Sequence, residues 1–541
     1  MTLMTFSAKT VSCLLQNAIR RPHVCGVVAE VHAEIHPTTR CFKSGHSLSA
    51  FGKGTVWSGR RESQSHLKGS KVFTLFRSSP QRNICLAMML ISASFAVTGT
   101  LSGCRGQVTN PSVPAITHFG YTGSSLMNTI LPANPSVAIS EAYFGMTIHE
   151  LYPKPASSNA AAPFPAFPVH TLRFWDVAYW AMLEPTAGQY DWSTMDGTIA
   201  TAKLNGVSDF IFTLGHVPTW ASTAPSDPCG SGEWLGSCDA PDRSALDDFL
   251  AQLVRRYCGV VQYYEAWNEP NLKQFWGGTN AQLLSIASDL HQIAKDPANC
   301  GCLNGVCSPG GGVNPNQVLL PSISSINGPN LGWLDAYLTA AGASYPYADV
   351  ASFHGYGYAQ PEDIVEGVAQ LNNTLGKHGL ARLALWDTEA SWGTTTTNNQ
   401  EQEVSWLMRF HVAQALAGIS RFVWYAYDNC AWGTLWGPAC RDSTDNWQGV
   451  RLPGEAYASV QGWMVGATLT HCDQYEDGLW ACELQRTGGY EGWMLWDSTG
   501  TGRSVLVPNH LQLTGYRDWQ NNTRVLPAEI TVDQLPVLVE N

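Results

Sequence analysis

The chain has 541 residues, of which 44% are hydrophobic, 14% charged and 11% aromatic. At about 150 residues per domain this length allows one large domain and one or two small ones. The low content of charged residues and the high content of aromatic residues exclude a disordered chain. The first 103 residues carry 12 Lys and Arg against 3 Asp and Glu, whereas the other 438 carry 19 against 40. Because a phosphate-binding face needs clustered Lys and Arg, this acidic body excludes nucleic acid as the main partner.

Residues 1–103 are interpreted as a leader. The apolar run 85–101 follows Arg77 and Arg82, and its length and small-residue breaks are typical of a signal-peptide core rather than of a bilayer span. It ends in the tetrapeptide Leu-Ser-Gly-Cys, which resembles a bacterial lipobox and predicts an exported protein lipidated on Cys104. The alternative is an ordinary signal or anchor. The residues before this run indicate either a start assigned too far upstream or a cytoplasmic extension.

The cysteines indicate an oxidising compartment. Fifteen are present, and ten of them follow Cys104; an even number with short spacings in an exported body is typical of disulfides. Three neighbouring pairs stand out: Cys229/Cys238, Cys430/Cys440 and Cys472/Cys482. The pairing of the other four stays open: Cys258, Cys300, Cys302 and Cys307. No nearby His or second Cys-x-x-Cys supports a metal site among them, so none is predicted.

Residues 140–467 alternate apolar, β-rich segments with helical ones. Eight segments are predicted as strands: 143–148, 170–175, 209–214, 261–267, 318–323, 350–354, 383–387 and 421–427. Six are predicted as helices: 242–257, 281–294, 331–341, 364–375, 401–417 and 455–465. Short, continuously apolar strands are typical of a parallel sheet covered on both faces, and eight of them alternating with helices favour a (β/α)8 TIM barrel. A doubly wound sheet is the alternative, but no Gly-rich phosphate turn follows the first strand.

Three parts of the chain differ from this pattern: segment 153–168, the C-terminal residues 468–541 and residues 104–139. Segment 153–168 is rich in Pro and Ala and fits a crossover helix poorly. Residues 468–541 contain short strand-like pieces between Gly and Asn turns, which predict a small antiparallel, β-sandwich-like domain. Its predicted strands are 480–484, 491–496, 504–507 and 523–525. Residues 104–139 are interpreted as a linker that contributes a further strand to this domain.

Two carboxylates stand at predicted strand ends. Glu269 follows the fourth strand and Glu389 the seventh, and catalytic groups of a barrel come from the C-terminal ends of its strands. Two facing carboxylates are the minimal machinery for glycosidic hydrolysis. Glu265 and Asp387 lie deeper on the same strands and are interpreted as buried salt-bridge partners.

The segment Trp267-Asn268-Glu269-Pro270, together with Thr388-Glu389 and Trp392, resembles clan A glycoside hydrolases, in particular family 39-like and family 5-like members. The resemblance covers roughly residues 140–467. It implies a retaining hydrolase of β-linked O-glycosides that acts on oligosaccharides or polysaccharides without a cofactor. In this role Glu269 is the acid/base and Glu389 the nucleophile.

The resemblance implies further roles. Asn268 contacts the sugar 2-hydroxyl, and Arg173 resembles the clan residue that holds the nucleophile ionised. His354 and Tyr356 resemble the His-x-Tyr whose phenol binds the nucleophile, with Tyr358 as the alternative phenol.

Aromatic residues supply candidate sugar platforms, since carbohydrate sites are commonly floored by flat aromatic faces. Trp424 on the eighth strand is the preferred platform, by its place in the clan. Other candidates are Trp180, Trp220, Trp276 and Trp392. His216, after the third strand, either contacts the sugar or packs a loop.

Two other functions remain open. One is a catalytically inactive, carbohydrate-binding lipoprotein. The other is a metal-dependent barrel hydrolase built on His149, His216 and His354, although it leaves the two glutamates without a role. Sugar identity, exo or endo action and oligomeric state are not determined by the sequence, and the expected membrane contact is limited to the lipid anchor or signal segment.

Overall fold

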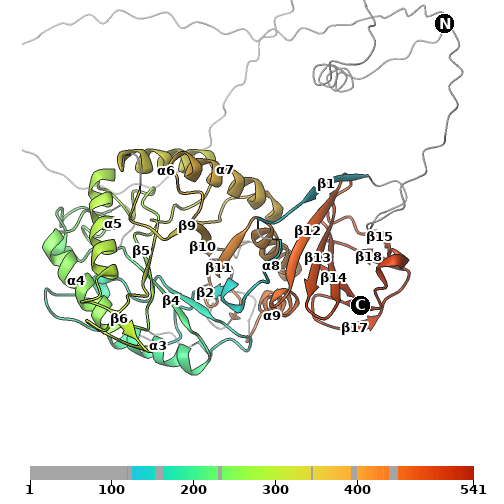
Figure 1. The fold of residues 1–541 in the computed structure, drawn as a ribbon, viewed down its shortest axis with the longest axis horizontal. Coiled ribbons are helices and arrows are strands. Elements are labelled where there is room, and N and C mark those ends of the chain that lie inside the picture. The colour runs from blue at the N-terminus through green and yellow to red at the C-terminus, as the bar shows by residue number, and fades with distance from the viewer. Residues whose placement is uncertain are drawn as a thin grey trace, which may run out of the picture. The chain divides into compact units, whose positions relative to one another are not determined.

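The structure is a computed structural model that describes residues 119, 125–133, 135–152, 162–229, 234–342, 345–391, 399–429, 432–437 and 449–541. The leader, its apolar run and Cys104 lie outside this set. Eight parallel strands close into a barrel in the order β10-β11-β2-β3-β4-β5-β8-β9 (Figure 1). They are β2 (Phe144–Met146), β3 (Thr171–Phe174), β4 (Asp209–Thr213), β5 (Tyr263–Glu265), β8 (Gln317–Leu319), β9 (Val350–His354), β10 (Ala384–Ala390) and β11 (Ile419–Trp424). The predicted TIM barrel is therefore confirmed, and each observed strand overlaps a predicted one.

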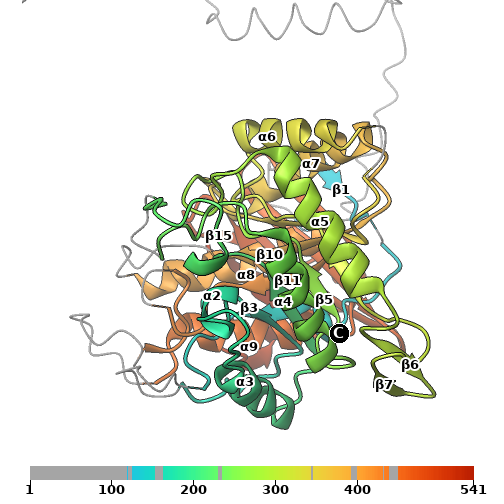
Figure 2. The ribbon, with the colours of Figure 1, turned by 90° about the vertical axis from the view of Figure 1, so that its left-hand side faces the viewer.

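Helices lie outside these strands, as Figure 2 shows for α4, α5, α6 and α7. The α-helices are α2 (Trp180–Leu183), α3 (Ser193–Leu204), α4 (Arg243–Arg256), α5 (Asn280–Lys295), α6 (Gly328–Ala340), α7 (Ile364–Lys377), α8 (Gln400–Leu416) and α9 (Leu452–Met464). Short 3-10 helices span Glu141–Tyr143, Thr219–Ala221, Pro361–Asp363 and Asn509–Leu511. All six predicted helices are present. The segment of α3 has little amphipathic pattern, which explains why periodicity did not reveal it.

Local sequence accounts for the strongest helices. In α4 one face is fully buried, through Leu246, Phe249, Leu250, Leu253 and Val254, which is the apolar stripe that a barrel helix turns toward the sheet. The side chain of Asp242 caps its first turn by accepting the N–H of Ala245. The connection between β2 and β3 contains no helix in its described parts, 147–152 and 162–170, in agreement with its Pro-rich sequence.

The barrel interior is filled beneath the strand ends. An apolar cluster of Ile211, Leu319, Val350, Trp386 and Val423 occupies it. The guanidinium of Arg421 lies 4.1 Å from the centroid of the Trp386 ring and pairs with Asp209 at 2.5 Å. A packed interior leaves the C-terminal strand ends as the place where polar groups can meet a ligand.

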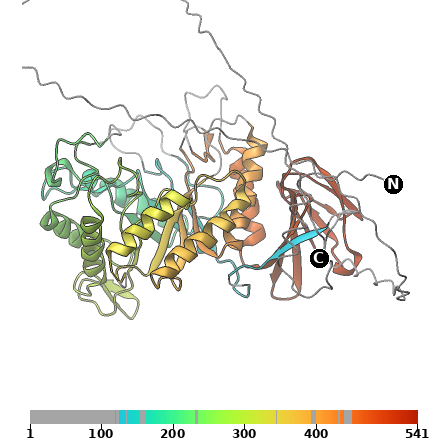
Figure 3. The same cartoon turned by 90° about the horizontal axis from the view of Figure 1, so that it is seen from above.

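The C-terminal residues build a seven-stranded sheet in the order β1-β12-β13-β14-β19-β16-β17, and β15 and β18 form a separate pair. Its strands are β1 (Leu126–Ile130), β12 (Thr468–Tyr475), β13 (Leu479–Arg486), β14 (Tyr490–Asp497), β16 (Gly515–Arg517), β17 (Thr523–Val525) and β19 (Val537–Glu540), and the pair is β15 (Arg503–Leu506) with β18 (Glu529–Val532). Strand β1 pairs antiparallel with β12 although more than 300 residues separate them, and Figure 3 shows it along that sheet. The predicted β-rich region is confirmed as a second, antiparallel part of the fold.

Strands β12, β13, β14 and β19 of this sheet are packed on both faces. One face joins the main core through Leu469, Trp480, Met494 and Trp496, among others. The Trp496 indole donates to Glu362 at 2.7 Å, and the Ser405 hydroxyl of α8 donates to the Gln534 carbonyl at 2.7 Å. The other face packs with the β15–β18 pair around Leu495, Val505 and Val532. The sheet thus stabilises the side of the barrel formed by α8 and α9.

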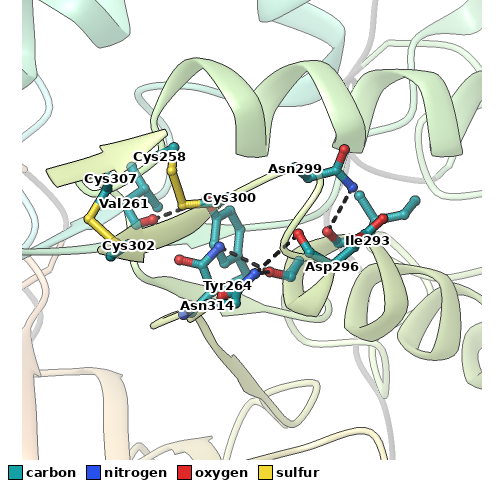
Figure 4. The surroundings of a disulfide bond; sticks show 12 residues. Cys258, Val261, Tyr264, Ile293, Asp296, Asn299, Cys300, Cys302, Cys307 and Asn314 are labelled. Atoms are coloured by element: carbon teal, nitrogen blue, oxygen red, sulfur yellow. Dashed lines mark hydrogen bonds between the residues drawn. A yellow bond between two sulfur atoms is a disulfide. The ribbon is translucent and has the colours of Figure 1, made fainter. Parts of the chain in front are cut away.

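Four disulfides are present in the described residues. Cys229–Cys238 and Cys472–Cys482 confirm two predicted pairs, and the third predicted pair, Cys430/Cys440, lies outside the described residues. The open connectivity is decided as Cys258–Cys300 and Cys302–Cys307 (Figure 4). The second of these closes the hairpin of β6 (Gly301–Leu303) and β7 (Val306–Ser308). Within the described part of the chain, none of the helices is both long and apolar enough to cross a membrane.

Candidate active site

Ionisable side chains from four barrel strands meet at the C-terminal ends of those strands. Arg173 is the last residue but one of β3, and His354 ends β9. Glu389 belongs to β10, and Glu269 follows β5. One ligand-type atom each of Glu269, His354 and Glu389 lies within 4.8 Å of the other two. The two glutamates singled out from the sequence are therefore neighbours in space.

Arg173 is the centre of this group and is fully buried. Its Nη1 donates to Glu389 Oε2 at 2.7 Å, and its Nη2 donates to Glu265 Oε2 at 2.7 Å and to Asn268 Oδ1 at 2.7 Å. Its Nε donates to the same Glu265 oxygen at 3.0 Å. A buried cation needs such compensation, and the arrangement fixes Glu389 and Asn268 relative to each other.

The two deeper carboxylates have different environments. Glu265 is a buried salt-bridge partner, as expected, and also accepts hydrogen bonds from Thr213 at 2.9 Å and Thr388 at 2.5 Å. Burial raises the pKa of Glu265, but Arg173 and its other partners lower it more, so the net pKa is below its usual value. For Asp387 the expected salt bridge is wrong: it accepts from the Gly355 N–H at 3.1 Å and from the Gln414 amide. Burial without a neighbouring cation raises its pKa strongly.

A β-bulge directs Glu389 toward Arg173. The register of β10 shifts between Asp387 and Glu389 against β9. Side chains alternate between the two faces of a regular strand, so Thr388 and Glu389 would otherwise point to opposite faces. The bulge breaks this alternation, and both side chains reach the buried polar group: Thr388 bonds Glu265 and Glu389 bonds Arg173.

Glu269 is held by its backbone and by His354. Its N–H donates to the Ser322 carbonyl at 2.8 Å, and its Oε1 lies 2.7 Å from His354 Nδ1. His354 Nε2 lies 3.4 Å from Arg173 Nη2, whose two protons already bond Glu265 and Asn268, and a proton on Nε2 would face this cation. The imidazole proton is thereby assigned to Nδ1, which donates to Glu269 Oε1 and leaves Oε2 for an acidic proton.

The two glutamates differ in charge environment. The pKa of Glu269 is raised to about 7: burial raises it most, Arg173 lowers it, and Glu265 and Asp176 add smaller increases. Burial also raises the pKa of Glu389, while His354 and Arg173 lower it. The expected effect of Arg173 on Glu389 has the predicted sign, but burial outweighs it. Because only Glu389 has a guanidinium at 2.7 Å, a single proton shared by the pair resides on Glu269.

Three consecutive strands are followed by a residue with left-handed backbone. Asp176 after β3, His216 after β4 and Glu269 after β5 have φ values of 62°, 50° and 44°. Such angles are uncommon for residues other than glycine and concentrate at functional sites. All three are polar residues in the segments that follow a barrel strand.

The structure separates the two candidate phenols and places His216 beside the site. The Tyr356 hydroxyl donates to Glu389 Oε1 at 3.2 Å, whereas the Tyr358 hydroxyl lies beside Gly367 of α7. His216 is buried and stacks on Trp175, with ring centroids 5.1 Å apart. Burial lowers the pKa of His216 to about 4, so at neutral pH it is an uncharged member of an aromatic cluster that borders the site.

The prediction that Trp424 forms the sugar platform is wrong. Its side chain is buried against His411 of α8 and Phe422, and its indole donates to the Gly433 carbonyl at 2.7 Å. Val423 points into the barrel, so alternation turns its neighbour Trp424 outward. Trp180 and Trp276 are also buried, Trp220 is 37% exposed, and Trp392 lies outside the described residues.

Other aromatic residues near the site are more exposed, and the sequence pattern did not single them out. Trp432 is 43% exposed and packs edge-on against Tyr356, at 5.5 Å between ring centroids. Trp234 is 39% exposed and contacts His216 in the same manner at 5.8 Å. Both lie in connections without helical or strand periodicity, so nothing in the sequence indicated their position.

A second polar cluster, also missed, joins the ends of three adjacent strands. His149 follows β2, Asp176 follows β3, and Tyr425 and Asp428 follow β11. Asp176 accepts hydrogen bonds from the Tyr179 and Tyr425 hydroxyls. His149 lies between the two carboxylates, with Nε2 3.3 Å from Asp176 Oδ2 and Nδ1 3.2 Å from Asp428 Oδ1.

The metal-ligand set considered from the sequence does not assemble. Among the described residues, His354 groups with Glu269 and Glu389, but His149 and His216 join no metal-type group. The group of Glu269, His354 and Glu389 could offer three ligand atoms to a metal, although the Arg173 guanidinium on Glu389 Oε2 disfavours a second cation there. A second group contains Cys229 and Cys238, whose sulfurs are joined in a disulfide.

The chain was compared with known proteins by sequence and by fold. No protein-family model matches the chain, and no curated protein sequence matches it significantly. Among solved structures, a family 39 glycoside hydrolase from Bacteroides cellulosilyticus WH2 is 16% identical with a TM-score of 0.54, covering 74% of this chain and 82% of its own. The GH39 enzyme from Xanthomonas axonopodis pv. citri is 15% identical with a TM-score of 0.50, covering 77% and 97%. The chain is thus similar in fold to two family 39 structures.

Proposed function

We propose that the chain is a retaining glycoside hydrolase that cleaves β-linked O-glycosides of oligosaccharides or polysaccharides. One observation carries the proposal: Glu269 and Glu389 present oxygens within 4.8 Å of each other at the barrel's C-terminal end. Retaining enzymes hold their two carboxyl groups about 5–5.5 Å apart, whereas inverting enzymes leave room for a water at about 6.5–9.5 Å. The 4.8 Å limit refers to one oxygen of each glutamate, and it supports the shorter, retaining arrangement, in which a carboxylate attacks.

In the first step Glu389 Oε1 or Oε2 attacks the anomeric carbon while Glu269 gives its Oε2 proton to the departing glycosidic oxygen. The Tyr356 hydroxyl, 3.2 Å from Glu389 Oε1, orients the attacking carboxylate. The covalent ester that forms removes the charge of Glu389 and leaves Arg173 paired with Glu265 alone. Before this step Arg173 is paired with two carboxylates, and after it with one. The buried guanidinium of the intermediate is therefore still paired with an opposite charge.

In the second step Glu269, now a carboxylate, takes a proton from water, and the resulting hydroxide equivalent releases the sugar from Glu389. Each of the two displacements inverts the configuration at the anomeric carbon, so the product keeps the configuration of the substrate. His354 Nδ1 donates to Glu269 Oε1 throughout and holds this carboxyl in place while its proton leaves and returns at Oε2.

We expect the newly formed hemiacetal to have the β configuration. Proton NMR of a running reaction with a panel of aryl β-glycosides measures it, because the α and β anomeric protons differ in coupling before mutarotation. Initial formation of the α anomer would contradict the double displacement. The same reaction is repeated with EDTA: loss of activity that Zn²⁺ or Mn²⁺ restores would favour the metal-dependent alternative. No turnover or oligosaccharide cleavage at all would favour the inactive binding protein.

We further propose that the protein acts outside the cytoplasm as a lipoprotein anchored through Cys104. Four disulfides in the described residues support an oxidising compartment. Mass spectrometry of the mature protein from a bacterial host is expected to find a diacylated or triacylated N-terminal Cys104. A mature chain beginning elsewhere, without lipid, would contradict the anchor and leave simple secretion.

A further inference from the structure

The polar cluster at the ends of β11, β2 and β3, next to the strand that carries Glu389, has an unusual balance of donors and acceptors. It consists of His149, Asp176, Tyr179, Tyr425 and Asp428, and is called the acceptor cluster below. Both tyrosine hydroxyls donate to Asp176, and both imidazole nitrogens of His149 face carboxylate oxygens, of Asp176 at 3.3 Å and of Asp428 at 3.2 Å. The two phenol protons are therefore used within the cluster and His149 is placed as an ion pair with both carboxylates, so a carboxylate of the cluster can offer a ligand only acceptor lone pairs.

His149 carries both ring protons in this arrangement. Each nitrogen faces a carboxylate oxygen, and an oxygen without a proton cannot donate in return. The pKa of His149 is raised to about 10: burial alone would lower it, but Asp176 and Asp428 raise it more. The cluster holds two carboxylates and one imidazolium, so its net charge is negative at neutral pH. Asp428 also accepts the backbone N–H groups of His149 and Glu150, each at 2.8 Å, which ties the cluster to the chain after β2.

Asp176 is the member that a ligand can reach. Its side chain is 32% exposed, whereas that of Asp428 is fully buried. It stands three residues after Arg173, whose guanidinium holds Glu389, and its backbone is left-handed. Its partner Tyr425 follows β11, the neighbour of the strand β10 that carries Glu389, and its charge raises the pKa of both Glu269 and Glu389. A sugar ring bound for attack by Glu389 therefore borders Asp176.

We propose that Asp176 is the specificity-determining residue of this site, accepting hydrogen bonds from hydroxyl groups of a neutral sugar and excluding sugars that carry a carboxylate. The inference rests on the proposed glycosidase function. A carboxylate held by two phenols and an imidazolium offers only acceptors to hydroxyl protons, and hydrogen bonds to a charged acceptor are about twice as strong as neutral ones. A uronic acid in the same place brings a second anion without a proton to share, and like charges at short distance repel.

The test compares Asp176→Asn, Asp176→Ala and Asp428→Asn with the wild type on 4-nitrophenyl β-xyloside, β-glucoside and β-glucuronide. Wild type is expected to prefer a neutral glycoside. Asp176→Asn lowers kcat/KM for that glycoside by about tenfold to hundredfold, through KM more than kcat, as loss of a charged hydrogen bond implies. Asp176→Asn also lowers the ratio of kcat/KM for the neutral glycoside to kcat/KM for the glucuronide, at least tenfold. Asp428→Asn removes a buried charge of the same cluster but leaves the acceptor Asp176 in place, so it is expected to lower that ratio less than Asp176→Asn does.

Monodeoxy analogues of the preferred glycoside locate the contact. Removing the hydroxyl whose hydrogen bond Asp176 accepts lowers kcat/KM of the wild type. The same removal causes no further decrease in kcat/KM of Asp176→Ala. An equal deoxy penalty in both proteins, or a glucuronide ratio that stays constant in Asp176→Asn, overturns the proposal. If no glycoside is hydrolysed by the wild type, the proposed function has failed instead. Calorimetric binding of xylose, glucose and glucuronate then decides, and equal affinities in wild type and Asp176→Ala overturn the assignment of Asp176. Thermal unfolding by circular dichroism checks that each variant is folded.

Discussion

Glu389→Ala is expected to lower kcat on the best aryl β-glycoside by on the order of 10⁴-fold or more, because it removes the nucleophile of a double displacement. Initial rates with 4-nitrophenyl and 2,4-dinitrophenyl glycosides measure the loss. Glu455→Ala, an exposed glutamate in the first turn of α9, serves as the control and is expected to keep wild-type activity. Retention of most activity by Glu389→Ala would contradict the assignment.

Azide separates a lost nucleophile from a damaged site. In Glu389→Ala, the missing side chain leaves space for azide to attack the anomeric carbon directly, so a β-glycoside yields an α-glycosyl azide. In Glu269→Ala, the glycosyl ester on Glu389 still forms with a good leaving group, and azide attacks it to give the β-glycosyl azide. The stereochemistry of the two products identifies which glutamate is the nucleophile. Identical azide configurations from both variants would contradict the roles proposed here.

Glu269→Gln is expected to lose activity in proportion to the basicity of the leaving group. General acid catalysis contributes about 10²- to 10⁴-fold, so we expect a loss in this range on alkyl glycosides or oligosaccharides. A 2,4-dinitrophenolate leaves without protonation, so the first step on that substrate falls little. Rates for a series of aryl glycosides plotted against the pKa of the phenol give a steeper slope in the variant than in the wild type. An equal loss on every substrate would contradict the acid/base role.

The same residue determines an expected limb of the pH profile. The acid must be protonated in the first step, and the pKa of Glu269 is raised to about 7, so kcat/KM of the wild type falls as pH rises through about 7. Glutamine does not titrate, so on a 4-nitrophenyl substrate Glu269→Gln lacks the limb that the wild type shows on the same substrate. A basic limb that persists unchanged in the variant would assign the titration to another group.

Much of the site could be read from residue type and strand position. Glu269, Glu389, Arg173, His354 and Tyr356 each follow or end a short apolar segment, and parallel strands bring their C-terminal ends to one side of a barrel. That rule placed Glu269 and Glu389 together without knowledge of any distance. Arg173, His354 and Tyr356 were singled out instead by the resemblance to clan A glycoside hydrolases. The rule did not identify which of Tyr356 and Tyr358 reaches Glu389, because that depends on the path of a loop.

Side-chain direction was beyond the sequence wherever the strand register is irregular or the neighbours are distant in the chain. Trp424 was placed on the wrong face because alternation on β11 can be counted only after its pairing with β10 and β2 is known. Asp387 was given a salt bridge, but the cation that would form it, Arg173, pairs with Glu265 and Glu389. Asp176 carried no signal, since a single aspartate after a strand is common.

The sequence by itself determined the fold class, the β-rich tail and the two glutamates, because apolar periodicity and residue order along the chain depend on local structure alone. The tertiary structure decided the charge relations that give those glutamates different properties. Arg173 is 216 residues from Glu389 in the chain yet 2.7 Å from it in space, and Tyr425 is 249 residues from Asp176. Burial and opposing charges set pKa values only after such distant segments have packed, so which carboxyl keeps its proton is a property of the closed barrel.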